Sequence, residues 1–109
     1  VFDDFKIPVI PMIGVIGVAP EGEPIPCGVP GNHGGNMDNA KIAKGATLYL
    51  PVFHDGAYLS CGDCHAGMGD GEIMVTGVEI PAKISNSTNV PFHSTSRCGM
   101  VKAPKGGIP

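Results

Sequence analysis

The chain has 109 residues, enough for one small domain with a limited core. Its 17 Gly and 11 Pro are about twice the usual share and only 16% of its residues are charged, so turns and short strands are expected to dominate. The formal net charge is −3, and the seven Lys and Arg residues are scattered along the chain, which argues against a nucleic-acid partner.

The most apolar stretch, residues 7–19, is too short to span a bilayer and is interrupted by proline and glycine. Asp3 and Asp4 stand before it, where an export signal would be basic. We therefore expect a cytoplasmic protein with no membrane partner. Its four cysteines are then expected to be thiols or metal ligands, since disulfides belong to exported proteins.

The first predicted element is a buried strand over residues 12–19, because the run MIGVIGVA is short, apolar and bounded by Pro and Gly. A Pro-rich loop over residues 20–30 follows. The next segment, PGNHGGNMDN, is rich in Gly and Asn, which adopt positive φ and let the backbone approach a ligand closely. We interpret it as a binding loop, with Gly34, Gly35 and Asn36 as substrate-binding residues.

One short helix is predicted near residues 39–44. Asp38 before it is a good N-cap residue, the segment itself contains good helix formers, and Gly45 suits the position after the last turn. Asp38 can cap this helix and bind a ligand at the same time.

Residues 47–53 alternate between apolar and polar side chains, and a turn at Asp55 and Gly56 leads into residues 57–61, so a hairpin is predicted. The loop GDCHAGMGDG separates it from a further strand over residues 72–79. Together these elements predict an all-β, antiparallel meander over residues 1–84, followed by an irregular tail over residues 85–109.

Two loops hold an unusual density of side chains that can bind metals. They are His33 and Asp38 in the first loop, and Asp63, Cys64, His65, Asp70 and Glu72 in or directly after the second. A hydrolytic zinc site needs about three His, carboxylate or thiolate ligands and an open position for water. The two loops supply such ligands if the fold brings them together, and loop N–H groups can stabilise an oxyanion.

The segments PGNHGGNMDN, GATLYLPVF and GDCHAGMGDGE, with IGVIGVAP upstream, are similar in order and spacing to those of the acetamidase/formamidase family. The resemblance runs from about residue 8 to residue 84. It implies hydrolysis of short aliphatic amides, a β-sandwich-like fold, a divalent metal and self-association. The polar positions of the family's site fall on five residues, namely His33, Asp38, Asp63, His65 and Glu72.

The resulting hypothesis is a metal-assisted amidase that releases ammonia from formamide or acetamide. A divalent ion, zinc with calcium as the alternative, is held by a subset of four residues, namely His33, Asp38, Asp63 and His65. Glu72 acts as the general base for water and Asp70 as a second catalytic carboxyl group. The partner is a small amide, and exposed strand edges predict a homo-oligomer.

Four other interpretations stay open at this point. The chain can be a metal-binding fragment of such an amidase without turnover. The sequence from Cys61 to His65 also matches the CxxCH pattern of c-type haem attachment, although it falls in a Gly-rich β protein. Finally, Cys61 and Cys64 can form a redox pair or, with His65, a structural zinc site.

Overall fold

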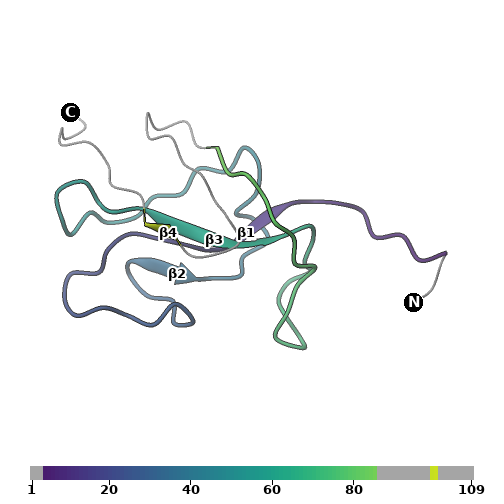
Figure 1. The fold of residues 1–109 in the computed structure, drawn as a ribbon, viewed down its shortest axis with the longest axis horizontal. Coiled ribbons are helices and arrows are strands. Elements are labelled where there is room, and N and C mark those ends of the chain that lie inside the picture. Colours follow the sequence, from purple (N-terminus) through teal and green to yellow (C-terminus); the bar gives the residue numbers. More distant parts are fainter. Residues whose placement is uncertain (1–3, 86–98, 101–109) are drawn as a thin grey trace.

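A computed structural model describes residues 4–85 and 99–100 of the chain. They form one antiparallel sheet with the strand order β2-β1-β3-β4 (Figure 1). The strands are β1 (Met12–Gly17), β2 (Gly34–Asn36), β3 (Ser60–His65) and β4 (Gly99–Met100). The prediction of an all-β, antiparallel fold is therefore confirmed.

Strand β1 is central in this sheet, with β2 on one side and β3 on the other, so Val15 lies opposite both Asn36 and Gly62. Four of its six residues are buried, among them the consecutive Gly14 and Val15, which face opposite sides of the sheet. A strand covered on both faces is a continuous apolar run and does not alternate. This confirms the predicted strand at residues 12–19, which ends at Gly17.

Strand β2 forms within the segment that was predicted to be a binding loop. Its residues Gly34 and Gly35 have φ values of 93° and 96°, in the region that favours glycine. A Cβ atom on Gly34 would collide with the carbonyl oxygen of Ile16 and lie 2.9 Å from Cα of Gly17. Glycine at this position therefore allows β2 to lie close against β1.

The predicted helix at residues 39–44 is wrong. Asp38 has a φ of 42°, whereas an N-cap residue is extended. The N–H group of Ile42 donates to the carbonyl of Asn39, which closes a turn. The carbonyl of Ile42 then accepts a hydrogen bond of 3.0 Å from the N–H group of Ile13 in β1. Pairing with the sheet overrides the helix propensity of this segment.

The strands predicted at residues 47–53 and 72–79 are not formed, and β3 instead begins at Ser60 and runs into the predicted loop at 62–71. The sequence SCGDCH shows no apolar alternation. It is a strand because it pairs with β1 from Gly17 to Met12, which buries its cysteines and His65. Tertiary pairing decides this element, as is common for strands.

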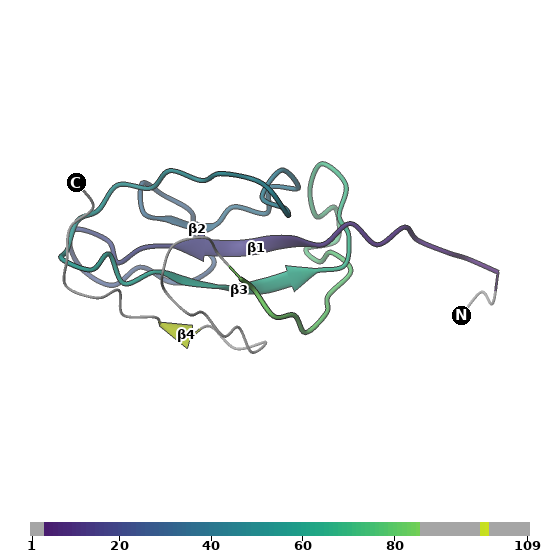
Figure 2. The same ribbon diagram turned by 90° about the horizontal axis from the view of Figure 1, so that it is seen from above.

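The core is small, as expected for the length of the chain. Its buried apolar side chains are Met12, Val15, Val18, Ile42, Cys61 and Cys64. Residues before β1 leave the sheet as an extended arm, which is visible in both ribbon views (Figures 1 and 2). Within the described ranges, no helix has the length and apolar character needed to cross a bilayer.

The predicted irregular tail at residues 85–109 lies almost entirely outside the described residues. The described part of it beyond residue 85 is β4, in which Gly99 pairs with Cys61 and Met100 with Ser60. The sheet therefore includes two residues of the segment that was expected to be irregular.

Candidate metal centre

His65, the last residue of β3, is the most unusual buried group in the described part of the chain. Its side chain is fully buried, and neither Nδ1 nor Nε2 has a hydrogen-bond partner among the described residues. Buried polar atoms in folded proteins are nearly always hydrogen-bonded, and an exception requires an explanation. The surroundings of the ring supply one.

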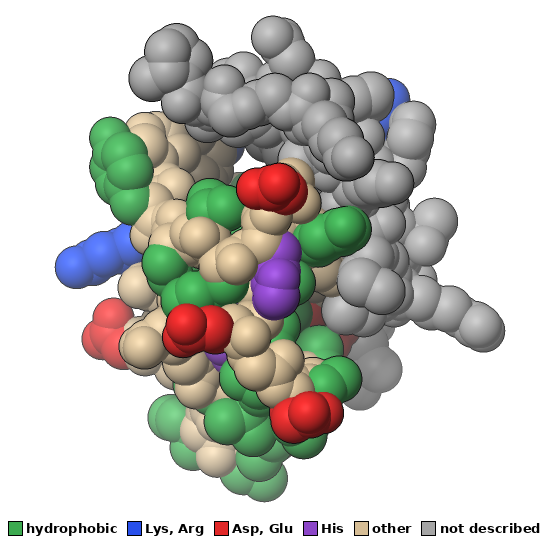
Figure 3. Space-filling view, turned by 90° about the vertical axis from the view of Figure 1, so that its left-hand side faces the viewer, with side chains coloured by type: hydrophobic (Ala, Val, Ile, Leu, Met, Phe, Trp, Pro, Cys, Tyr) green, Lys and Arg blue, Asp and Glu red, His purple; other side chains and the backbone are tan. Residues whose placement is uncertain are grey.

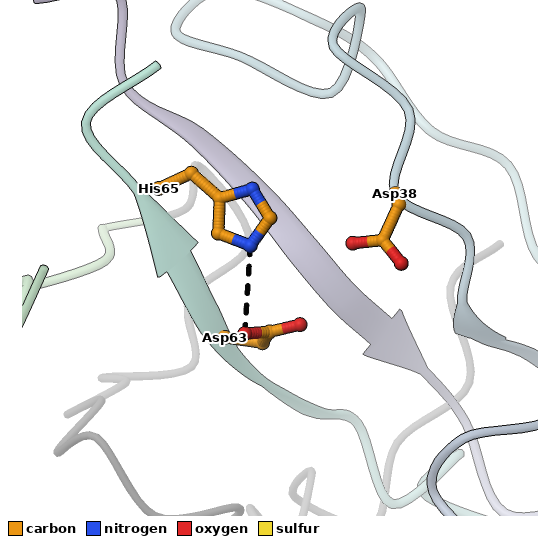
Figure 4. A group of neighbouring side chains, drawn as sticks. All are labelled: Asp38, Asp63 and His65. Atoms are coloured by element: carbon orange, nitrogen blue, oxygen red, sulfur yellow. Dashed lines mark ion pairs between the residues drawn. The ribbon is translucent and has the colours of Figure 1, made fainter. Parts of the chain in front are cut away.

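Three carboxylates surround Nε2 of His65. Oε1 of Glu79 lies 3.1 Å from it, and Oδ1 of Asp63 and Oε1 of Glu72 each lie 3.5 Å from it. Figure 4 shows the contact with Asp63. Although these oxygens are close, their directions do not meet hydrogen-bond geometry with the ring nitrogen. One nitrogen facing several acidic oxygens is an arrangement that a cation would stabilise.

Asp38 adds a fourth carboxylate from the turn after β2. Its Oδ1 is also buried without a partner among the described residues. One ligand atom each from Asp38, Asp63 and His65 lie within 4.8 Å of one another, and the same holds for His65, Glu72 and Glu79. Figure 4 shows Asp38 and Asp63 converging on the imidazole from separate segments. We call these five residues the His65 cluster.

Local backbone geometry directs two of the carboxylates into the cluster. Asp63 has a φ of 53° within β3, a left-handed conformation that Asp tolerates better than most residues. Gly14 of β1 lies beneath the carboxylates, because a Cβ atom there would be 2.7 Å from both Oδ1 of Asp38 and Oδ2 of Asp63. The missing side chain of Gly14 leaves the space that these two carboxylates occupy.

Glu79 was missed by the sequence analysis. In the strand predicted over residues 72–79, Glu72 and Glu79 are seven positions apart and would face opposite sides. The chain instead turns at residues 73–75 and returns, so that Glu79 forms a bridge with His65. Sequence alternation gave the wrong geometry here, and only the turn brings both glutamates to one ring.

The donor set fits a divalent cation. Zinc is bound in proteins by imidazole nitrogen and carboxylate oxygen, both of which the His65 cluster offers, whereas calcium takes oxygen ligands. Two structural features support this fit. The nitrogens of the fully buried ring lack hydrogen-bond partners among the described residues, and Gly14 leaves room for two of the carboxylates.

A cavity of about 320 Å³ adjoins the cluster. The described residues that line it are Asp63, Cys64, Glu79, Ile80 and Pro81. This volume is at the lower end of the range for small-molecule sites. Two members of the cluster therefore face a space that can hold a molecule larger than water.

His33 is not brought to the cluster. Its carbonyl accepts a hydrogen bond of 2.8 Å from the N–H group of Val18, beyond the end of β1, whereas His65 lies opposite Met12 at the start of β1. Six residues of strand correspond to about 20 Å. The expectation that His33 and His65 bind one ion is therefore corrected. Asp70 is exposed and belongs to neither group of ligand atoms.

The predicted substrate-binding residues have other positions. Asn36 lies opposite Val15, so the register places it on the face of the sheet away from Gly14. Its Oδ1 is buried without a partner in the described part of the chain. Gly34 and Gly35 pair with Gly17 and Ile16 of β1, and neither is among the described residues that line the cavity.

The CxxCH pattern has a geometry that opposes haem attachment. Cys61 and Cys64 are both buried, and they pair with Ile16 and Ile13, three residues apart on β1. They consequently point to opposite faces of the sheet, so two thioether bonds to one haem, or a disulfide between them, would need the strand to be rebuilt. His65 belongs to the acidic cluster.

Comparisons with known proteins point to one family. A sequence model of the acetamidase/formamidase family matches residues 24–103. This match extends past residue 84, where the resemblance in the motifs ends. The chain is 46% identical over 48 residues to a formamidase of Methylophilus methylotrophus and to an acetamidase of Mycolicibacterium smegmatis. These alignments cover 44% of this chain and 12% of each relative.

Among solved structures, an acetamidase from Bacillus halodurans superposes with a TM-score of 0.70 and 59% sequence identity. The superposition covers 72% of this chain and 26% of that protein, so the chain spans only a part of the length of its relatives. The matched residues include the whole His65 cluster. On this evidence the chain belongs to the acetamidase/formamidase family.

Proposed function

We propose that this chain contains the metal-binding part of an amidase that hydrolyses the C–N bond of small aliphatic amides. Formamide and acetamide are the proposed substrates, because the relatives are named formamidase and acetamidase. The observation that carries the metal-assisted part of the proposal is the buried ring of His65, whose Nε2 faces three carboxylates at 3.1–3.5 Å.

Asp38, Asp63 and His65 would hold a divalent ion, most simply zinc, with Glu79 completing the ligand set. A bound zinc ion polarises a carbonyl group and lowers the pKa of water toward neutrality. The chain's own contribution is to bring three donors from two segments, the residues after β2 and strand β3, around one space beside the buried ring of His65.

Glu72 is the proposed proton carrier. Its side chain is only 15% exposed and its Oε1 lies 3.5 Å from Nε2 of His65, so it borders the space in which water would attack. Glu72 accepts a proton as the water oxygen bonds to the amide carbon. It returns this proton to nitrogen as the C–N bond breaks, and ammonia and the carboxylic acid leave. Asp70, predicted as a second catalytic carboxyl, is exposed, so we assign both transfers to Glu72.

The cavity beside the cluster suits a small neutral substrate. Ile80 and Pro81 contribute apolar lining, and Asp63 and Glu79 contribute carboxylates. An uncharged primary amide brings no further charge into a space that the acidic side chains border.

Ammonia release from formamide and acetamide tests the proposal. The rate is measured on the chain as purified, after removal of metal with a chelator, and after zinc is restored. We expect chelation to abolish the activity and zinc to recover it. A rate that is indifferent to metal removal would refute metal assistance, and turnover of neither amide would refute the substrate class.

A second candidate is a metal-binding fragment without turnover. It is favoured by one observation, the coverage of 12% and 26% of the relatives' lengths, since substrate-binding walls can lie in the remainder. Zinc stoichiometry near one together with no ammonia release, at concentrations high enough to populate an oligomer, would select this candidate over the enzyme.

A further inference from the structure

The segment from Thr76 to Ile80 runs beside the end of β3 and is fixed there by backbone hydrogen bonds. The N–H group of Ala66 donates to the carbonyl of Val78 at 2.7 Å, and the N–H group of Ile80 donates to the carbonyl of Cys64 at 2.9 Å. These bonds lie on both sides of His65 in the sequence. The segment is therefore attached to the residues that flank the buried imidazole.

Thr76 and Gly77, directly after the turn at residues 73–75, also hold the carboxylate of Glu79. Its Oε1 accepts a hydrogen bond from the N–H group of Gly77 at 3.1 Å and lies 3.3 Å from the hydroxyl group of Thr76, whose one proton is shared between this oxygen and the carbonyl of Gly77 at 3.2 Å. The same oxygen is 3.1 Å from Nε2 of His65. Although the Glu79 side chain is 48% exposed, these two donors fix the oxygen that faces the ring.

Gly77 packs against the imidazole itself. A Cβ atom at this position would collide with Nδ1 of His65 and lie 2.8 Å from Cγ and 2.9 Å from Cε1. The backbone of Gly77 is not in the left-handed region, so alanine can adopt its conformation. Glycine is needed at this position because a side chain would collide with the ring, and not because of the backbone conformation.

We propose that Thr76 and Gly77, directly after the turn at residues 73–75, form a positioning element for the His65 cluster. Gly77 sets the plane of the imidazole, and the Thr76 hydroxyl with the Gly77 N–H group sets the Glu79 carboxylate. Neither residue touches substrate. Groups of this kind, which orient metal ligands, typically change metal affinity by about 10–100-fold when removed. That consequence rests on the proposed function, whereas the orientation of the ring does not.

Two variants test this proposal in the full chain. Gly77→Ala places a methyl group against the ring, and Thr76→Val removes the hydroxyl group with little change of shape. Gly69→Ala is the matched control for the first, because a Cβ atom there meets nothing within 4 Å and its backbone is not left-handed. Thr76→Ser, which keeps the hydroxyl group, is the control for the second.

Two measurements are made on each variant. The first is the NMR shift of the His65 ring protons, with their cross-relaxation to the α protons of residue 77, in the metal-free chain. The second is zinc affinity by calorimetry. We expect Gly77→Ala and Thr76→Val to change the ring signals and to weaken zinc binding about tenfold or more, while Gly69→Ala and Thr76→Ser retain wild-type values.

The outcomes separate this inference from the proposed function. If the wild-type chain binds no zinc, the cation proposal fails and the ring signals alone decide the positioning role. If Gly77→Ala does not fold, Thr76→Val decides. Unchanged ring signals in the folded variants would overturn the inference, as would a Thr76→Ser variant that is perturbed as strongly as Thr76→Val.

Discussion

Carboxylates from three parts of the chain lie around the imidazole of His65. They belong to Asp38 after β2, to Asp63 in β3, and to Glu72 and Glu79 on the two sides of one turn. Four carboxylates around one buried ring repel one another unless positive charge is present. In the proposed function a divalent ion would supply that charge, and His65 would be the residue on which cation binding depends.

Replacement of His65 and replacement of His33 should therefore affect zinc binding differently. We expect His65→Ala to weaken zinc binding by more than about 100-fold, since even groups that only orient a ligand account for about 10–100-fold. His33→Ala should leave the affinity unchanged, because His33 lies beyond the other end of β1. Calorimetry on both variants measures this. Equal losses in the two variants would place the ion elsewhere.

The two acidic residues Asp70 and Glu72 provide a similar comparison for catalysis. Removal of a general acid or base typically lowers a rate by about 100-fold to 10,000-fold. We expect a loss in this range for Glu72→Gln, and little loss for Asp70→Asn, because Asp70 is exposed and outside the cluster. Ammonia release with zinc present is the measurement, and a larger loss for Asp70→Asn would reverse the assignment.

At the residue scale, much of the cluster could be predicted from sequence. Asp63, His65 and Glu72 stand close together in a Gly-rich segment, and Asp38 stands in another such segment. His33 has the same local signal but a different place in the register, and Glu79 has no signal at all. Composition finds residues that can bind a metal, but strand pairing decides which of them meet.

Among the elements, the strand predicted at residues 12–19 is present as Met12–Gly17, because a central strand is defined by its own apolar sequence. Residues 39–44 have helix formers and residues 47–53 alternate, yet neither forms the regular element. Strand β3 has a sequence without strand character, and it exists because it pairs with β1. In so small a sheet, long-range pairing outweighs local propensity.

The close approach of β2 to β1 leads to a prediction about stability. Gly34→Ala forces a side chain into the left-handed region, which costs about 1–2 kcal/mol, and brings its Cβ atom against the backbone of Ile16 and Gly17. Gly45→Ala has a similar φ of 88° with nothing within 4 Å, so it isolates the conformational cost. Urea unfolding should show the larger loss for Gly34→Ala. Equal losses would mean that β2 does not pack as described.

For the molecule as a whole, the described surface carries much apolar area. Phe5 and Val9 of the arm are 73% and 70% exposed, and Ile73, Met74 and Val75 are 97%, 80% and 87% exposed. On the face shown in Figure 3, apolar side chains lie open between separated acidic ones. Exposed apolar surface of this extent is typical of protein that forms further contacts.

This surface underlies the prediction of a homo-oligomer. Association would remove apolar side chains of the arm and of the turn at residues 73–75 from water. Light scattering at micromolar concentration should give a mass above that of one chain, and replacement of Ile73 and Val75 by Ser should reduce it. A monomeric mass for the unmodified chain would contradict the prediction.

The central claim is that residues distant in sequence surround one divalent ion at His65. A crystal of the chain grown with zinc, measured on both sides of the zinc absorption edge, tests it most directly. We predict one anomalous peak within bonding distance of Nε2 of His65 and of at least two carboxylates of the cluster. A map without a peak there, or with its peak beside His33, would contradict the account.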